Sequence, residues 1–369
     1  MNRISNFQIY CLLVTSTLPL AYLITPMIVI YAARNGAWLA VLTSIIPGLL
    51  LVYVYMYIIK KSSRPFPALL EDCMGKVVGK IVGFLYILVF LFTIAFTLRY
   101  FVALIGSSIV PATPLSVYIG AMLLTGCYAL RTGLENVARV SEIVVLLGLP
   151  LSILLVLISM AQAPHVGSLT PILGTDYGGF GRAFLFSFII TGEMIAILTL
   201  AHFTNDRSQV SRPVFMVLFT YIALMTITTI TALLKFEVDY ANLISFPTFK
   251  LVRSITISDF IQNIEVVFVS VWIIGTFAAI TIKWYLACYT TQQVFALRDY
   301  RFLAAPTSVV IGFGSLMVGR NIAEIQIIVH ELIPYVYGII YILIPFLVFI
   351  VLLFKPAPET DTKLNSPAA

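Results

Sequence analysis

The feature that most constrains this chain is a series of apolar runs, each long enough to cross a lipid bilayer, that recurs along all 369 residues. A helix of about 20 apolar residues matches the thickness of the hydrocarbon layer. Hydrophobic residues make up 60% of the chain and charged residues only 10%, whereas soluble domains contain about 25% charged residues. Water-soluble folds are therefore excluded, and a polytopic membrane protein is predicted.

The runs divide into ten spans, and no break longer than a loop separates them. Only helices and closed barrels satisfy every backbone polar group in lipid. These runs are too long and too uniformly apolar for barrel strands. The sequence therefore predicts an all-α integral membrane protein with one transmembrane domain over 1–354, followed by a polar, Pro-rich tail, 355–369, that we expect to be disordered. The predicted spans are 8–33, 37–59, 79–109, 114–131, 136–161, 180–203, 212–235, 259–286, 304–320 and 325–354.

Lysine and arginine are distributed unevenly between alternate loops. With the N-terminus inside, 14 of them fall on the inner side and 6 on the outer side. Because positive residues accumulate in cytoplasmic loops, both termini and the tail are predicted to be cytoplasmic. The inner segment 64–76 is expected to form a short interfacial helix, and the outer loop 236–258 to cap an extracellular cavity. Topology thus accounts for the net charge of +6 without a nucleic-acid partner.

Residues that carry chemistry are sparse. The four cysteines, at 11, 73, 127 and 288, are far apart in the sequence, and they have neither metal-binding spacing nor the pattern of a disulfide framework. The chain contains no P-loop, no HExxH motif and no nucleophile elbow. We therefore predict no catalytic site, metal or cofactor, and we do not expect an enzyme.

The first span contains two prolines within its apolar run. Pro19 and Pro26 each remove a helical hydrogen bond and clash with the preceding turn. Hydroxyl residues, including Thr17, lie nearby. The stretch Pro19–Tyr22 is therefore a candidate break in the helix. The alternative is an ordinary proline kink whose freed backbone groups are satisfied by neighbouring helices.

The sixth span has Thr191, Gly192 and Glu193 near its middle. Glycine weakens a helix, and a charge at membrane depth costs at least ~2.5–3.5 kcal/mol unless it finds a partner or a water-filled cavity. Interrupted helices at corresponding positions of two halves indicate a midplane binding site, and five spans separate this position from the first span. A 5+5 inverted repeat with broken spans 1 and 6 is predicted. The alternative is a glycine at a helix contact with a glutamate bonded across it.

Arg99 lies in the third span, where its guanidinium needs a carboxylate, carbonyls or water. Glu193 and Glu265 are the partners that the sequence offers. A structural ion pair and a ligand-binding role both remain open for Arg99.

Two further charged residues lie nearer the ends of their spans. Lys283 is expected to snorkel from the inner end of the eighth span, and Glu142 to be solvated or paired with Arg139. The candidate ligand-binding set is Thr17, Pro19, Ala21, Tyr22, Arg99, Tyr100, Thr191, Gly192, Glu193 and Glu265.

These features resemble the B subunit of bacterial endospore germinant receptors (the GerAB type), a branch of the amino acid–polyamine–organocation transporter superfamily. The resemblance covers nearly the whole chain. Its best segments are RTGLENVARVSEIVVLLGLP at 131–150 and ISFPTFKLVRSITISDFIQNIEVVFVSVWIIGTF at 244–277. The second segment combines a proline in the outer loop with Asp259, Glu265 and Trp272 at family-like spacing.

The resemblance implies a LeuT-like fold with a ligand pocket between broken spans 1 and 6, closed by spans 3 and 8. Arg99 and the Gly192–Glu193 region also match the family pattern. It implies a spore inner-membrane location, an A subunit and a lipoprotein C subunit as partners, and a small germinant such as an amino acid, sugar or nucleoside. One departure is that Pro19 and Ala21 stand where a Gly-x-Gly break is usual. Bare amides there would bind a carboxylate, so the ligand class stays open.

Two classes of function follow. The first is a receptor subunit that binds a germinant and passes a conformational change to partner chains. The second is an independent transporter of an amino acid or related solute, with protons moving through Glu193 or Glu265. The missing Gly-x-Gly and the family resemblance favour the receptor.

Overall fold

The described chain is all-helical, apart from an isolated bridge between Ile4 and Thr204. The all-α fold class is thereby confirmed. The predicted tail, 355–369, lies outside the described residues. The computed structural model describes 4–62, 64–109, 112–164, 166–170, 176–204, 206–256 and 264–354.

Within these described ranges, a helix or a series of helices occupies each of the ten predicted spans. Eight helical stretches have the length and apolarity of a membrane crossing; the first, Asn6–Lys61, contains two predicted spans, and the helix Arg301–Met317 is shorter. The count of ten crossings stays a prediction. The helices are α1 (Asn6–Ala33), α2 (Ala37–Thr43), α3 (Ile45–Lys61), α4 (Phe66–Met74), α5 (Lys76–Ser108), α6 (Leu115–Thr132), α7 (Leu134–Ala161), α8 (Tyr177–Thr191), α9 (Ile197–Leu200), α10 (Ser211–Phe236), α11 (Val238–Ala241), α12 (Pro247–Arg253), α13 (Glu265–Val294), α14 (Ala304–Met317), α15 (Ile322–Ile327), α16 (Ile333–Tyr337) and α17 (Ile344–Phe354).

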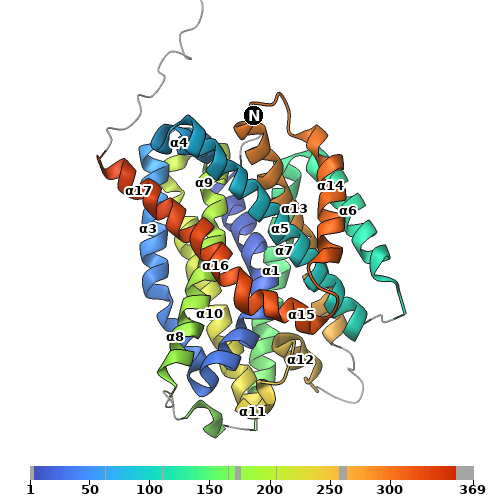
Figure 1. The fold of residues 1–369 in the computed structure, drawn as a ribbon. Coiled ribbons are helices and arrows are strands. Elements are labelled where there is room, and N and C mark those ends of the chain that lie inside the picture. Colours follow the sequence, from blue (N-terminus) through green and yellow to red (C-terminus); the bar gives the residue numbers. More distant parts are fainter. Residues whose placement is uncertain are drawn as a thin grey trace, which may run out of the picture.

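Helix α1 is the centre of the fold. Every side chain from Ile9 to Ile30 is buried, and a helix that is apolar on all sides belongs in an interior. It packs against α7, α8, α10 and α13. In Figure 1 the start of α1 and the end of α17 lie at one end of the molecule, while α11 and α12 lie at the other. This arrangement fits an even number of crossings, with α11 and α12 opposite the start of α1 and the end of α17.

The predicted break in the first span is wrong, because α1 is one continuous helix through both prolines. Donors from other helices stabilise the kinked backbone instead. Pro26 has no N–H to donate to the Tyr22 carbonyl, and the Thr248 hydroxyl of α12 donates to that carbonyl at 2.5 Å. The proline-kink alternative therefore describes α1, and the loop that contains Thr248 has a specific attachment point on it.

We expect Thr248→Val to destabilise the protein by about 1–3 kcal/mol, because it leaves the Tyr22 carbonyl unpaired in a buried position. The thermal unfolding midpoint of the purified chain measures this loss. Thr229→Val is the matched control, since the buried Thr229 hydroxyl donates only within its own helix, to the Met225 carbonyl at 2.8 Å. Equal losses in both variants would contradict a role for the loop hydroxyl.

The sixth span is interrupted where the sequence predicts it. Helix α8 ends at Thr191, and the 3-10 segment Gly192–Ala196 separates it from α9. A Cβ added at Gly192 would lie 2.9 Å from the Cβ of Tyr341 in the last span. Close packing of the sixth span against the last span therefore requires a glycine at position 192. This agrees with the alternative given above, a glycine at a helix contact.

The two structured loops are helical. The predicted interfacial segment 64–76 contains α4, which packs on the start of α5. The segment 236–258, predicted to be an outer loop, contains α11 and α12, and α12 packs on α1, α7, α10 and α13. Residues of this loop also line a cavity of about 890 Å³ together with α1, α8 and the last span; we call it the outer cavity, after the predicted orientation.

Candidate functional site

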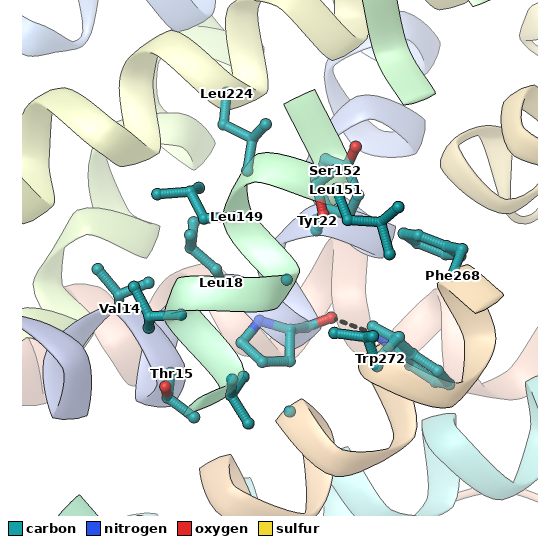
Figure 2. Close-up of a pocket in the computed structure, with 16 residues that line it drawn as sticks. Val14, Thr15, Leu18, Tyr22, Leu149, Leu151, Ser152, Leu224, Phe268 and Trp272 are labelled. Carbon is teal, nitrogen blue, oxygen red and sulfur yellow. Dashed lines mark hydrogen bonds between the residues drawn. The ribbon is translucent and has the colours of Figure 1, made fainter. Parts of the chain in front are cut away.

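A cavity lies beside the kink of α1, bordered by α1, α7, α10 and α13. Its volume is about 70 Å³, several times the space that one water molecule needs. Of the ten predicted site residues, Pro19 and Tyr22 line it. Figure 2 shows how α7 and α13 present side chains towards α1; the labelled residues are Val14, Thr15, Leu18, Tyr22, Leu149, Leu151, Ser152, Leu224, Phe268 and Trp272.

The cavity wall is largely apolar, with a few polar groups at the kink. Trp272 Nε1 of α13 donates to the Pro19 carbonyl at 2.9 Å, the bond drawn as a dashed line in Figure 2. Pro19 in turn has no N–H to donate to the carbonyl of Thr15, one turn earlier. The buried Thr15 hydroxyl has no hydrogen-bond partner among the described residues. The unpaired Thr15 hydroxyl therefore offers a small ligand a hydrogen bond within a largely apolar chamber, and a few polar groups in an apolar wall are usual for a small-molecule site.

Glycine keeps this chamber open on the α13 side. Gly275 faces Pro19 Cγ and Val144 Cγ1, which would lie 3.5 and 3.4 Å from an added Cβ. Such distances are ordinary van der Waals contacts, so a methyl group at this position fills space without a clash. Trp272 and Gly275 lie one turn apart on the same face of α13, and together they define the wall opposite α1.

Glu193 lies in a different place and has a partner that the sequence did not indicate. Lys283 Nζ is 3.1 Å from both carboxylate oxygens of Glu193, and the two side chains are 3% and 5% exposed. The prediction that Lys283 snorkels to the inner surface is therefore wrong. The Glu193 carboxylate does not pair with Arg99, and the ion pair joins the 3-10 segment of the sixth span to α13.

Buried tyrosines of other spans bond to the backbone of the last span. The last span contains two π-helical segments, Ile328–Leu332 and Gly338–Leu343. Hydroxyls from α3 and α5 satisfy carbonyls of the second segment: Tyr55 donates to the Tyr341 carbonyl and Tyr86 to the Ile340 carbonyl, both at 2.5 Å. The π-helical backbone is thus held by side chains from two other spans.

Arg99 is buried, and its guanidinium bonds to backbone carbonyls. Nε donates to the Gly319 carbonyl at 2.7 Å and Nη2 to the Arg320 carbonyl at 2.8 Å. A guanidinium at this depth needs a carboxylate, carbonyls or water as partners, and Arg99 has carbonyls. Neither Glu193 nor Glu265 is bonded to Arg99. The contacts tie α5 to the turn between α14 and α15.

The other predicted residues are spread around these features. Thr17 and Tyr100 are buried, and their hydroxyls have no hydrogen-bond partner among the described residues. The Tyr100 ring packs edge-on against Phe246 of the outer loop at 5.4 Å. Ala21 is buried within α1, and Glu265 is the half-buried first residue of α13.

Glu142 is half-buried and lies within α7. Arg139 pairs instead with Glu135, whose Oε1 is 2.9 Å from Arg139 Nη2. The suggested Glu142–Arg139 pair is therefore not formed.

Comparisons with known proteins agree on family and fold. The family model described as "Spore germination protein" matches residues 3–323. Spore germination protein KB of Bacillus subtilis (strain 168) is 25% identical over 369 residues, which cover 98% of this chain and 97% of that protein.

Among solved structures, MhsT in complex with L-phenylalanine has a TM-score of 0.68 at 14% identity, with 96% of both chains covered. A Na+-coupled sialic acid symporter has a TM-score of 0.66 at 12% identity, covering 96% of this chain and 80% of that one. Identities this low show the fold alone, and that fold is the LeuT-like transporter fold.

Proposed function

The chain belongs to the spore germination protein family, and we propose that it is the transmembrane, ligand-sensing subunit of a spore germinant receptor. The observation that carries this proposal is the cavity at the α1 kink. It is bordered by four spans and lined on one side by α13 residues and on the other by α1 residues that include the unpaired Thr15 hydroxyl. A ligand seated there touches the central helix of the fold and changes its packing.

The walls indicate the kind of germinant. Val144, Leu149 and Phe268 offer no hydrogen bonds, so a sugar would leave most of its hydroxyls unpaired at considerable cost. A small compound with one apolar portion and one or two hydrogen-bonding groups matches the cavity best. We place its polar end at the unpaired Thr15 hydroxyl, and its apolar end against α7.

We propose that the outer loop controls access to this chamber. The Thr248 hydroxyl on the Tyr22 carbonyl and the Phe246 ring on Tyr100 hold α12 against the spans around the kink. Residues 242–245 of this loop line the outer cavity of about 890 Å³. A germinant entering from outside the inner membrane would pass this loop, and its binding would then be transmitted to an A subunit and a lipoprotein C subunit.

The transporter fold also motivates a second function, independent transport of a small solute. Proton transport through Glu193 is disfavoured, because Lys283 neutralises this carboxylate in a buried pair. Two measurements separate the functions. Spores that lack this chain are expected to lose their response to one germinant, and liposomes containing the purified chain alone are expected to take up none of that compound. Uptake by the chain alone, with an unchanged response of the deletion spores, would establish the transporter instead.

A further inference from the structure

We propose that the Glu193–Lys283 pair is a monovalent-cation site whose cation is supplied by the chain itself. The Lys283 ammonium occupies the position that a free ammonium-sized ion would take at Glu193. The protein consequently needs no bound sodium or potassium at this carboxylate, and removal of the tethered ammonium exposes a site for a free cation.

The charge balance supports this assignment. Three charged side chains are buried among the described residues: Arg99, Glu193 and Lys283. Arg99 is bonded to carbonyls of the turn before α15, so the charge of Glu193 is balanced by Lys283. The pair is neutral as a whole, which explains how a carboxylate remains stable in the interior of a membrane domain.

The geometry is that of an ion seated between two oxygens. Lys283 Nζ is equidistant from Oε1 and Oε2 of Glu193, at 3.1 Å from each. The Tyr337 hydroxyl donates to Thr93 Oγ1 at 3.1 Å and also interacts with the same carboxylate. The Glu193 carboxylate, which holds the ammonium, thus lies in a polar environment to which the last span and α5 contribute.

The position of Lys283 gives the tethered cation a mechanical consequence. It lies on α13, eight residues after Gly275 and therefore about two turns from the cavity wall. Its partner lies in the 3-10 segment that interrupts the sixth span. The fixed charge of Lys283 thereby holds α13 at one position along the interrupted sixth span. This position does not depend on which ions surround the protein.

The test is chemical rescue of the full chain, purified into lipid nanodiscs. Lys283→Ala removes the ammonium and leaves a void at Glu193, whereas Lys283→Met removes the charge but fills that void. Thermal unfolding midpoints are measured at equal ionic strength in the chlorides of ammonium, methylammonium, sodium and tetramethylammonium. For Lys283→Ala we expect a midpoint at least about 5 °C higher in ammonium or methylammonium than in tetramethylammonium. The wild type, Lys283→Met and the double variant E193Q/K283A are expected to show no such selectivity.

Three results would overturn the proposal. One is the absence of any difference between the four salts for Lys283→Ala. Another is recovery of this variant by acidification and not by ammonium, which would mean that a proton neutralises Glu193. The third applies if Lys283→Ala fails to accumulate in cells: continued failure in medium containing methylammonium, while E193Q/K283A is produced normally, would exclude a free-cation site. No germinant is used, so these results are independent of the proposed receptor function.

Discussion

Glu193→Gln is expected to remove most of the protein from the membrane, because it leaves the Lys283 ammonium uncompensated in the interior. Lys283→Met is expected to do the same by leaving the Glu193 carboxylate without its partner. Breaking a buried ion pair from one side costs about 3–5 kcal/mol, a large part of the stability of an ordinary domain. Membrane abundance by immunoblot and the unfolding midpoint of the purified chain measure this effect.

The double variant E193Q/K283M provides the matched control. It removes both charges, keeps two side chains of similar length, and should recover most of the abundance lost in the single variants, since replacing a whole buried pair by uncharged groups is often nearly neutral. A double variant as depleted as the single variants would mean that the volume or shape of these side chains matters more than their charge.

Gly275→Ala is expected to lower sensitivity to the germinant by roughly tenfold to a hundredfold while leaving abundance unchanged. The added methyl group meets Pro19 and Val144 at ordinary contact distances, so the empty protein accommodates it. Alanine also favours the helix by up to about 1 kcal/mol over glycine. A bound ligand, however, must share a cavity of about 70 Å³ with the methyl group, and overpacking costs ~1–3 kcal/mol. The germinant concentration that gives a half-maximal germination rate measures the change.

Gly120→Ala is the control for this substitution. Gly120 lies within α6, and a Cβ added there meets nothing within 4 Å. It receives the same gain in helix propensity without any change to the cavity. An equal loss of sensitivity in both variants, or a normal response of Gly275→Ala, would place the ligand elsewhere.

The fold could be predicted from the sequence because membrane insertion depends on local composition. Runs of about 20 apolar residues identify spans whatever their neighbours are, and helices occupy all ten predicted ranges. The break in the sixth span was equally local, since Gly192 and Glu193 both disfavour an undisturbed apolar helix. These features depend on short stretches of sequence, so neighbouring spans were not needed to infer them.

The contacts that decide the site could not be predicted, because they join residues far apart in the sequence. Two prolines in α1 predicted freed carbonyls, but not that Thr248 of the outer loop would satisfy one of them. The same limit applied to charges. Arg99 and Glu193 looked like partners because both lie at membrane depth, whereas packing placed Lys283 against Glu193. The prolines of α1 indicated where the cavity lies. On the opposite wall, Trp272 was the one lining residue that the family resemblance had singled out.

Protection of a cysteine in the cavity tests the central claim most directly. In a background that lacks the four native cysteines, Ser152→Cys places a thiol in the α7 wall, and Ser116→Cys places one at the exposed start of α6. The account predicts that the germinant to which the spores respond slows labelling of the Ser152→Cys protein by a small thiol reagent, in a concentration-dependent way, and leaves labelling of the Ser116→Cys protein unchanged. Labelling of the Ser152→Cys protein at the same rate with and without a saturating concentration of that germinant would contradict it.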